Sequence, residues 1–513
     1  MARLASLRRA GALSWALASL TSCLWGGAVS LAAPPHRETA ADPPLGVLMK
    51  GVSPLTPWSA VSARPLSSAE RLEALKRRLF RNRDHLERSS RRLTLPEAIA
   101  MGLERNPSLA KAHAGIEATR WSGVAIRREW APSLVVGNND PGLLGMQQQQ
   151  ADTLSISSPE LTLEWTFFDP SRTPRVRANA ASLEAERFLF DVQARSLVLN
   201  VQESYIDLQA LLALEVEYRQ LSAIVDHWLQ LAQARRPAGA STPDVDQLLS
   251  QQLAQLILRV DTHEQVIAAA SKLAQALSLP PGELVLPAEP LALQGQWTLS
   301  REETITQALR LREEIQRSLA TARSLAWGAV ATRKGYLPTL SLEGTGSTQS
   351  SSDTSDLNSQ GAVGMNVQWT LFDGGILAAK ATSQRKQQEQ ALQQAALDRL
   401  TVTTEVETSY AAFINSQIVV DSAIAQMESA RASFLSATKS FQAGSSDATT
   451  LLQVLANTRG AVEAYCRALR KHNRSVAELE RYSARWPAAA QSLLRQRVAR
   501  LQVSAPASAA PGR

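Results

Sequence analysis

The chain has 513 residues, of which 44% are hydrophobic, so it is long and apolar enough to bury a core or to form two to four domains. Its net charge of +7 falls to +4 without Arg3, Arg8 and Arg9, which is too mild over this length to indicate a nucleic-acid partner. Aromatic residues make up only 5%, and the abundance of Ala, Gln, Leu, Arg and Glu favours long helices.

Residues 1–33 have the pattern of a secretory signal peptide. The three basic residues near the start precede an apolar run from Ala10 to Ala33, and Ser30-Leu31-Ala32 supplies small residues for cleavage. An N-terminal membrane anchor is the alternative interpretation of the same run.

The two cysteines also bear on this segment. Leu20-Thr21-Ser22-Cys23 resembles a lipoprotein box, which gives lipidation of Cys23 as a further alternative, although apolar residues continue after the cysteine. If Cys23 is removed with the signal peptide, Cys466 is the only thiol left. No internal disulfide is then expected, so stability must come from packing or assembly.

Residues 34–92 form a separate leader. Residues 34–66 are rich in Pro and Ala, which is typical of a poorly ordered stretch. Ser68 to Arg92 is predicted to be a basic helix, most simply a solvated one, because a nucleic-acid arm is out of place in a secreted chain.

Residues 93–282 carry the first of two similar units. Thr94-Leu95-Pro96-Glu97 combines a cap residue with Glu three positions later, which predicts a helix start. The expected order is a helix to about Glu129 with a break at Asn106-Pro107, strands at 134–136 and 160–168, a long helix at 175–236, a turn at 237–243 and a helix at 244–279.

Residues 283–486 repeat that order. The expected elements are a helix at 301–334, a strand from Thr339, a polar loop at 347–360, a return strand at 362–372, a long helix at 376–443, a turn at 444–446 and a helix at 447–485. The tail 487–513, rich in Ser, Ala, Pro and Arg, is predicted to be disordered.

The two units are a duplication. Trp165-Thr166-Phe167-Phe168-Asp169 matches Trp369-Thr370-Leu371-Phe372-Asp373 at an offset of 204 residues. Gly239 matches Gly444 at 205, and Trp130-Ala131-Pro132 matches Tyr336-Leu337-Pro338 at 206. A nearly constant offset is stronger evidence of fold than any single motif.

The long helices carry an apolar stripe. Residues at intervals of seven are Val406, Phe413, Val420, Met427, Phe434 and Phe441. A sustained seven-residue repeat indicates left-handed supercoiling against neighbouring helices, so the stripe is expected to be core and not a cofactor site.

The strands alternate between an apolar face and a polar face carrying Thr, Glu, Asn and Gln, as the strands of a membrane barrel do. Four strands cannot close a barrel, and open edges in lipid leave backbone groups unpaired. Three chains would supply a barrel of roughly twelve strands, wide enough for a water-filled lumen.

Four aromatic residues flank these strands: Trp130, Trp165, Tyr336 and Trp369. They are predicted to form an aromatic girdle at one membrane interface. Packing between helices and sheet is the alternative role.

The chain resembles the outer-membrane efflux protein (TolC-like) family over about residues 93–485. The resemblance rests on the order of the elements and on two motifs, Trp369-Thr370-Leu371-Phe372-Asp373-Gly374-Gly375 and Phe441-Gln442-Ala443-Gly444. The resemblance implies a mainly α fold with a small membrane β-barrel contribution, assembled as a homotrimer with an α-helical barrel crossing the periplasm. It also implies outer-membrane lipid around the barrel, a periplasmic adaptor protein and an inner-membrane pump as partners. Departures from the family pattern are Pro170 in place of Gly374, Phe441 where a Tyr is usual, and the extra segment 34–92.

In this topology both turns lie at the periplasmic end, and a pore tip or gate is predicted at Gly239, Asp244, Asp246, Phe441, Gly444 and Asp447. Three copies of an inward-facing Asp would form an acidic ring that favours cations. Helix capping is the alternative role of Asp244 and Asp447, and Gly239 and Gly444 most simply permit left-handed turns.

No enzyme is expected. The six His are scattered without metal-ligand spacing, and no phosphate loop or nucleophile elbow is present, so neither a cofactor nor a metal is predicted. Carboxylates such as Glu203, Glu405 and Glu407 are expected to be solvated. The predicted function is a passive exit channel of an efflux or type I secretion system, and the alternative is a secreted coiled-coil scaffold without channel activity.

Overall fold

The computed structural model describes residues 66–138, 155–156, 159–235, 242–351, 357–487 and 490–491. The predicted signal peptide, Cys23 and Gly239 therefore lie outside the described residues, as does most of the predicted tail. The chain divides into two units, Met1–Ser68 and Ala69–Arg513, and the architecture below is that of the second.

Helix α1 (Leu66–Ser89) confirms the predicted basic helix, and a strand pair that the sequence did not reveal follows it. Strand β1 (Arg91–Leu93) lies parallel to β5 (Val285–Pro287), with Arg92 opposite Leu286. Leu93, Val285 and Leu286 are buried, so this short pair joins the start of the first copy to the segment that follows that copy.

Helices α2 (Leu95–Arg105) and α3 (Pro107–Arg128) confirm the predicted break in the first copy. Thr94 and Glu97 form the predicted capping box: the Thr94 side chain accepts from the Glu97 amide, and the Glu97 carboxylate accepts from the Thr94 amide. At the break, Asn106 has φ −68° and ψ 123°, and its side chain accepts from the Ser108 amide to cap α3.

The second copy has a break at the equivalent place, and the prediction of one helix over 301–334 is wrong. Helix α6 (Arg301–Leu311) and helix α7 (Glu313–Lys334) are separated at Arg312, which has φ −64° and ψ 124°. No Pro marks this break, and the Arg312 side chain forms no cap. Its guanidinium instead bonds Glu314, Glu405 and the carbonyl of Tyr482.

The long strands form an antiparallel sheet in the order β2–β4–β6–β7, built from β2 (Ser133–Asn138), β4 (Pro159–Phe168), β6 (Thr339–Ser351) and β7 (Leu357–Gln368). The two-residue strand β3 (Ser155–Ile156) pairs with the far end of β6. Strands β6 and β7 reach farther than expected, into the predicted 347–360 loop, whereas Trp369 to Phe372 lie beyond β7 and not within it.

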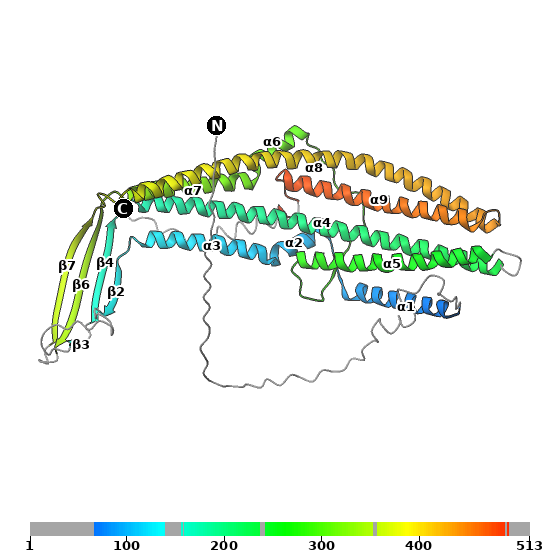
Figure 1. Cartoon of the computed structure of the whole chain (residues 1–513), viewed down its shortest axis with the longest axis horizontal. Helices are drawn as coiled ribbons and strands as arrows, with labels where there is room; N and C mark the ends of the chain where they lie inside the picture. The colour runs from blue at the N-terminus through cyan, green and yellow to red at the C-terminus, as the bar shows by residue number, and fades with distance from the viewer. Residues whose placement is uncertain are drawn as a thin grey trace, which may run out of the picture. The chain divides into compact units, whose positions relative to one another are not determined.

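Four further helices form two hairpins: α4 (Arg172–Arg235) with α5 (Thr242–Ala276), and α8 (Ile376–Ala443) with α9 (Ala448–Tyr482). Figure 1 shows the members of each hairpin side by side, with β4 leading into α4 and the Asp373-Gly374-Gly375 turn joining β7 to α8. The 68 residues of α8 give it a length of roughly 100 Å at about 1.5 Å per residue. None of the helices in the described part of the chain combines the length and apolar character needed to cross a bilayer.

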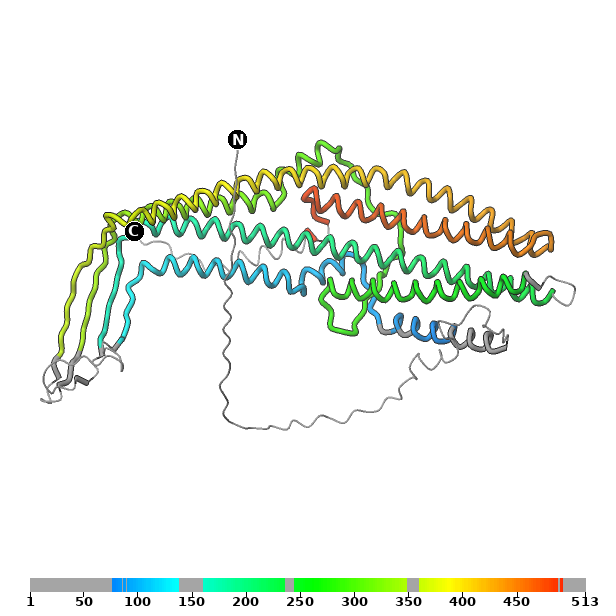
Figure 2. Tube along the Cα trace, in the orientation of Figure 1, coloured from blue at the N-terminus to red at the C-terminus, as the bar shows by residue number. Residues whose placement is uncertain are grey.

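The predicted apolar stripe of α8 is confirmed as core. All six residues at the seven-residue interval, from Val406 to Phe441, are no more than 9% exposed. In the half of the bundle nearest the hairpin turns, Phe434 and Phe441 belong to one cluster that also contains Trp228 and Val225 of α4, Val245 and Leu248 of α5, and Leu451 and Leu455 of α9. Both hairpins therefore share a core, and the tube view in Figure 2 shows them running alongside one another.

Ion pairs join the two copies midway along the bundle. Arg195 of α4 bonds Glu313 of α7 at 2.8 Å and so joins the two copies, whereas Arg481 of α9 bonds Glu314 at 2.6 Å within the second copy. Two carboxylates that the sequence analysis expected to be solvated are also paired, Glu203 with Arg474 and Glu405 with Arg312, both at 2.9 Å. The expectation was wrong for these two because their charge partners are distant in sequence, Arg474 on α9 and Arg312 at the α6–α7 corner.

Candidate functional site

The first candidate element is the apolar face of the sheet. Register places Leu134 opposite Leu163, Leu163 opposite Gly344, and Gly344 opposite Val363, so one row of this face crosses all four long strands. A neighbouring row contains Trp165, Leu342 and Met365. These apolar side chains are exposed to a degree unusual for a water-soluble surface: Val363 is 79% and Met365 67% exposed.

The opposite face of the sheet is polar, as the alternation predicted. Glu164 of β4 lies directly opposite Glu343 of β6, and Ser133 lies opposite Glu164 on its other side. Asn366 of β7 donates from its side-chain nitrogen to Glu343 Oε1 at 3.0 Å. One face therefore suits lipid and the other suits water, and the boundary between them is the sheet itself.

The sheet has two unpaired edges. In the described part of the chain, β2 pairs only with β4, and β7 pairs only with β6. Their outward-facing backbone donors and acceptors have no strand partner within this chain, which leaves them available for pairing with another chain.

The four predicted girdle residues lie in two matching pairs where helices meet strands. Trp165 Nε1 donates to the carbonyl of Trp130 at 2.9 Å, and Trp369 Nε1 donates to the carbonyl of Tyr336 at the same distance. Trp130, Trp165 and Trp369 are between 39% and 59% exposed, so their rings are not packed into a helix–sheet core. The duplication thus extends to individual hydrogen bonds.

The two copies enter their long helices differently. In the second copy Gly374 and Gly375 have φ of +68° and +86°, and the Asp373 carboxylate accepts from the amides of Gly375 and Leu377. The first copy has Pro170 in place of this glycine pair. There Arg175 bonds both Asp169 and Glu129, so charged side chains hold the corner.

The second candidate element is the α8–α9 turn, where three predicted tip residues meet. Gly444 has φ +79° and ends α8, confirming the predicted left-handed turn. Asp447 caps α9 by accepting from the Thr450 amide at 3.0 Å, and hydrogen bonding from the Thr450 side chain and amide lowers the pKa of the Asp447 carboxyl. Phe441 is 5% exposed and packs in the shared core, with its ring under the Arg235 guanidinium.

The α4–α5 turn is described only at its two ends. Helix α5 begins at Thr242, so Asp244 lies inside its first turn and not at the predicted cap position. A negative charge there still complements the helix dipole. Asp244 is half-buried and Asp246 is exposed.

Arg235 joins the two turns, and the sequence analysis missed it. It is the last residue of α4, yet its guanidinium donates to the carbonyls of Phe441 and Gln442 at 2.9 and 2.5 Å, at the end of α8. It thereby adds hydrogen bonds to carbonyls at a helix C-terminus, where the Phe441 carbonyl also accepts from the Gly444 amide and where the dipole favours a cation. An Arg at the end of a helix next to a turn was the only sequence signal for this contact.

The architecture is a duplicated bundle of helical hairpins joined to a sheet of four long strands with one apolar face. Residues 304–485 match the family model described as outer membrane efflux protein. This match confirms, over these residues, the family resemblance that the sequence predicted.

Solved structures share the fold. The Campylobacter jejuni CmeC outer membrane channel aligns with a TM-score of 0.65 and 14% identity, covering 78% of this chain and 89% of that one. The open state of the Neisseria gonorrhoeae MtrE outer membrane channel aligns with a TM-score of 0.61 and 18% identity, covering 76% and 89%. The outer-membrane channel OprN aligns with a TM-score of 0.62 and 19% identity, covering 76% of this chain and 89% of that one. No curated protein matches the chain in the sequence comparison.

Proposed function

We propose that the chain is one subunit of a homotrimeric exit channel in the outer membrane. The observation that carries this proposal is the sheet, which combines a continuous apolar face with two free edges. A surface of this kind is stable in lipid only if both edges are paired, because hydrocarbon offers no substitute hydrogen bonds. Three copies, each contributing four long strands, would close a barrel of about twelve strands with the polar face inward.

The long helices then determine how the channel reaches its partners. Both hairpins extend roughly 100 Å from the sheet, a distance suited to crossing the periplasm. The turns at their far ends would meet a periplasmic adaptor protein and, through it, an inner-membrane pump of an efflux or type I secretion system. The chain itself would conduct drugs or polypeptides passively, without cofactor or enzymatic chemistry.

Within this assembly the predicted sites keep their roles. Trp130, Trp165, Tyr336 and Trp369 would form the aromatic girdle at the inner interface of the barrel. Asp244, Asp246 and Asp447, with Phe441 and the two turn glycines, would surround the periplasmic pore tip, where repeated carboxylates favour cations.

The test is to purify the full chain from outer-membrane fractions, measure its mass in detergent and record it in planar bilayers. A heat-modifiable trimer with single-channel conductance is the expected result. A monomeric soluble rod without conductance would instead support the secreted scaffold and contradict the channel.

A further inference from the structure

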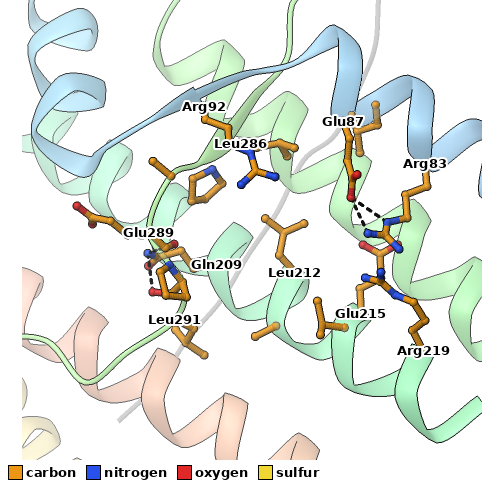
Figure 3. Close-up of a pocket in the computed structure, with 16 residues that line it drawn as sticks. Arg83, Glu87, Arg92, Gln209, Leu212, Glu215, Arg219, Leu286, Glu289 and Leu291 are labelled. Atoms are coloured by element: carbon orange, nitrogen blue, oxygen red, sulfur yellow. Dashed lines mark hydrogen bonds and ion pairs between the residues drawn. The ribbon is translucent and has the colours of Figure 1, made fainter. Parts of the chain in front are cut away.

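A cavity of about 500 Å³ lies away from the sheet and the hairpin turns, between α1, α4 and the segment that contains β5. Figure 3 shows Leu212 of α4 pointing into it from one side and Leu286 of β5 facing it from another. Its volume lies within the range of small-molecule sites, roughly 300–1,000 Å³. The channel proposed above assigns this cavity no role.

Six charged side chains surround the apolar centre, and three of them, Arg83, Glu87 and Glu215, are already paired. Arg83 of α1 donates to Glu87 from Nε at 3.1 Å and from Nη2 at 2.6 Å. Glu215 of α4 is buried and lies 3.2 Å from His263 Nδ1. The third carboxylate of the lining, Glu289, is exposed, so water solvates it.

Two guanidinium groups of the cavity lining have no charged partner among the described residues. Neither Arg92 nor Arg219 forms a side-chain hydrogen bond or an ion pair with any residue that the structure describes. Arg219 Nε is buried without an acceptor, which leaves a desolvated donor unsatisfied. A native structure seldom keeps such a donor buried unless a ligand or water completes it.

The surroundings of Arg219 favour an anion. In Figure 3, Arg219 lies close to Arg83 and Glu215 at one side of the cavity, and Arg92 points into the cavity from β1. Burial, together with the nearby Arg83 guanidinium, lowers the pKa of Arg219, and the carboxylates of Glu215 and Glu87 only partly oppose this effect. An anion bound there would offset both the lost solvation and the repulsion between the two cations.

We propose that this cavity binds a ligand with a carboxylate head and an apolar body. The carboxylate would accept hydrogen bonds from Arg92 and Arg219, whose planar guanidinium groups match its geometry. The apolar body would cover Leu212 and Leu286. This chemistry has two sources, a free aliphatic carboxylic acid or an acidic residue beside apolar residues in a peptide.

The strand geometry supplies a matched control. Arg91 and Arg92 are consecutive in β1, so their side chains point to opposite sides of the strand, and only Arg92 lines the cavity. Both are exposed, so neither Arg91→Gln nor Arg92→Gln threatens the fold. Arg219→Lys provides a second variant that keeps the charge but loses the bidentate geometry.

The experiment is calorimetric titration of the full-length protein held in amphipol, with empty amphipol as blank. The probes are hexanoate and N-acetyl-leucyl-glutamyl-leucinamide. Hexanol, inorganic phosphate and the glutamine form of the peptide are the matched probes lacking either charge or apolar body. We expect one or both acidic probes to bind, about tenfold or more weakly in Arg92→Gln and in Arg219→Lys, and with unchanged affinity in Arg91→Gln.

The pattern of binding identifies the source: hexanoate alone indicates a free acid, and the peptide alone indicates a protein partner. Binding by neither probe would overturn the proposal. Equal loss in Arg91→Gln and Arg92→Gln would overturn it as well, because it would reveal a diffuse charge effect and no site. The channel assignment does not depend on this result, since none of these residues belongs to the sheet or the hairpin turns.

Discussion

The guanidinium of Arg235, the last residue of α4, donates to the main-chain carbonyl of Phe441 near the end of α8 at 2.9 Å. Two hairpins from different copies of the duplication are therefore tied together at their turns by one side chain. Phe441 also packs in the core that both hairpins share, so its carbonyl is hydrogen-bonded to Arg235 while its ring is held by apolar neighbours.

We predict that Arg235→Ala loosens the hairpin turns and raises the resting conductance of the purified channel. The loss of two partly exposed charge-assisted hydrogen bonds should cost about 1 kcal/mol, enough to increase the population of an opened tip several-fold. Arg235→Lys keeps the charge near the helix end and should have a smaller effect. If bilayer recordings show identical resting conductance in the wild type and both variants, Arg235 does not hold the hairpin turns closed.

We predict that Asp447→Asn reduces cation preference without disrupting α9. Asn caps helices about as well as Asp, so the fold should survive while the charge is lost. Reversal potentials under a salt gradient measure the change, and Asp246→Asn, on the other hairpin, provides a comparison. A reversal potential that does not move would place Asp447 outside the ion pathway.

The α8–α9 turn also gives a stability prediction with a built-in control. Gly444 has φ +79° and no atom within 4 Å of an added Cβ, so Gly444→Ala should destabilise by about 1–2 kcal/mol through backbone strain alone. Gly460, inside α9, has equally open space, so Gly460→Ala should stabilise by about 1 kcal/mol. Urea unfolding of the two variants should shift in opposite directions, and a shift of the same sign would contradict this account.

Asp191 makes stability depend on pH. Burial, with Glu313 nearby, raises the pKa of Asp191 to about 6 despite the opposing Arg195. The folded state thus holds the proton more tightly than the unfolded chain. This group's contribution to stability is greatest below about pH 4 and falls as the pH rises through about 6.

Asp191→Asn should therefore stabilise the protein by about 1–3 kcal/mol at neutral pH and have little effect below about pH 4. Thermal unfolding across this pH range measures it, with Asp421→Asn, on an exposed part of α8, expected to stay within about 0.5 kcal/mol of wild type. An equal gain at every pH would show that packing and not ionisation causes the effect.

Periodicity predicted much of the fold because it reports directly which face of an element is buried. The bounds of α8, 376–443, were predicted to the residue, since a Gly stands at each end. The alternation of β4 and β7 gave the two faces of the sheet correctly. These are local signals, and they need no knowledge of distant residues.

What the sequence left hidden depends on contacts between distant residues. Strands β1 and β5 have three residues each, too few for a pattern, and they exist because each completes the other. Likewise, the contacts of Arg235, Glu203 and Glu405 could not be predicted from local sequence, because their partners are distant in sequence. The four aromatic residues that flank the strands, in contrast, could be placed because the duplication displayed each position twice.

The corners at Asn106 and Arg312 show what the two copies have kept in common. Their backbone angles agree within a few degrees, yet one corner is fixed by an amide that caps the next helix, and the other is fixed by a guanidinium reaching across to another helix. The two copies of the duplication thus share the direction in which the chain turns at this corner, while the side chain that fixes the turn differs between them.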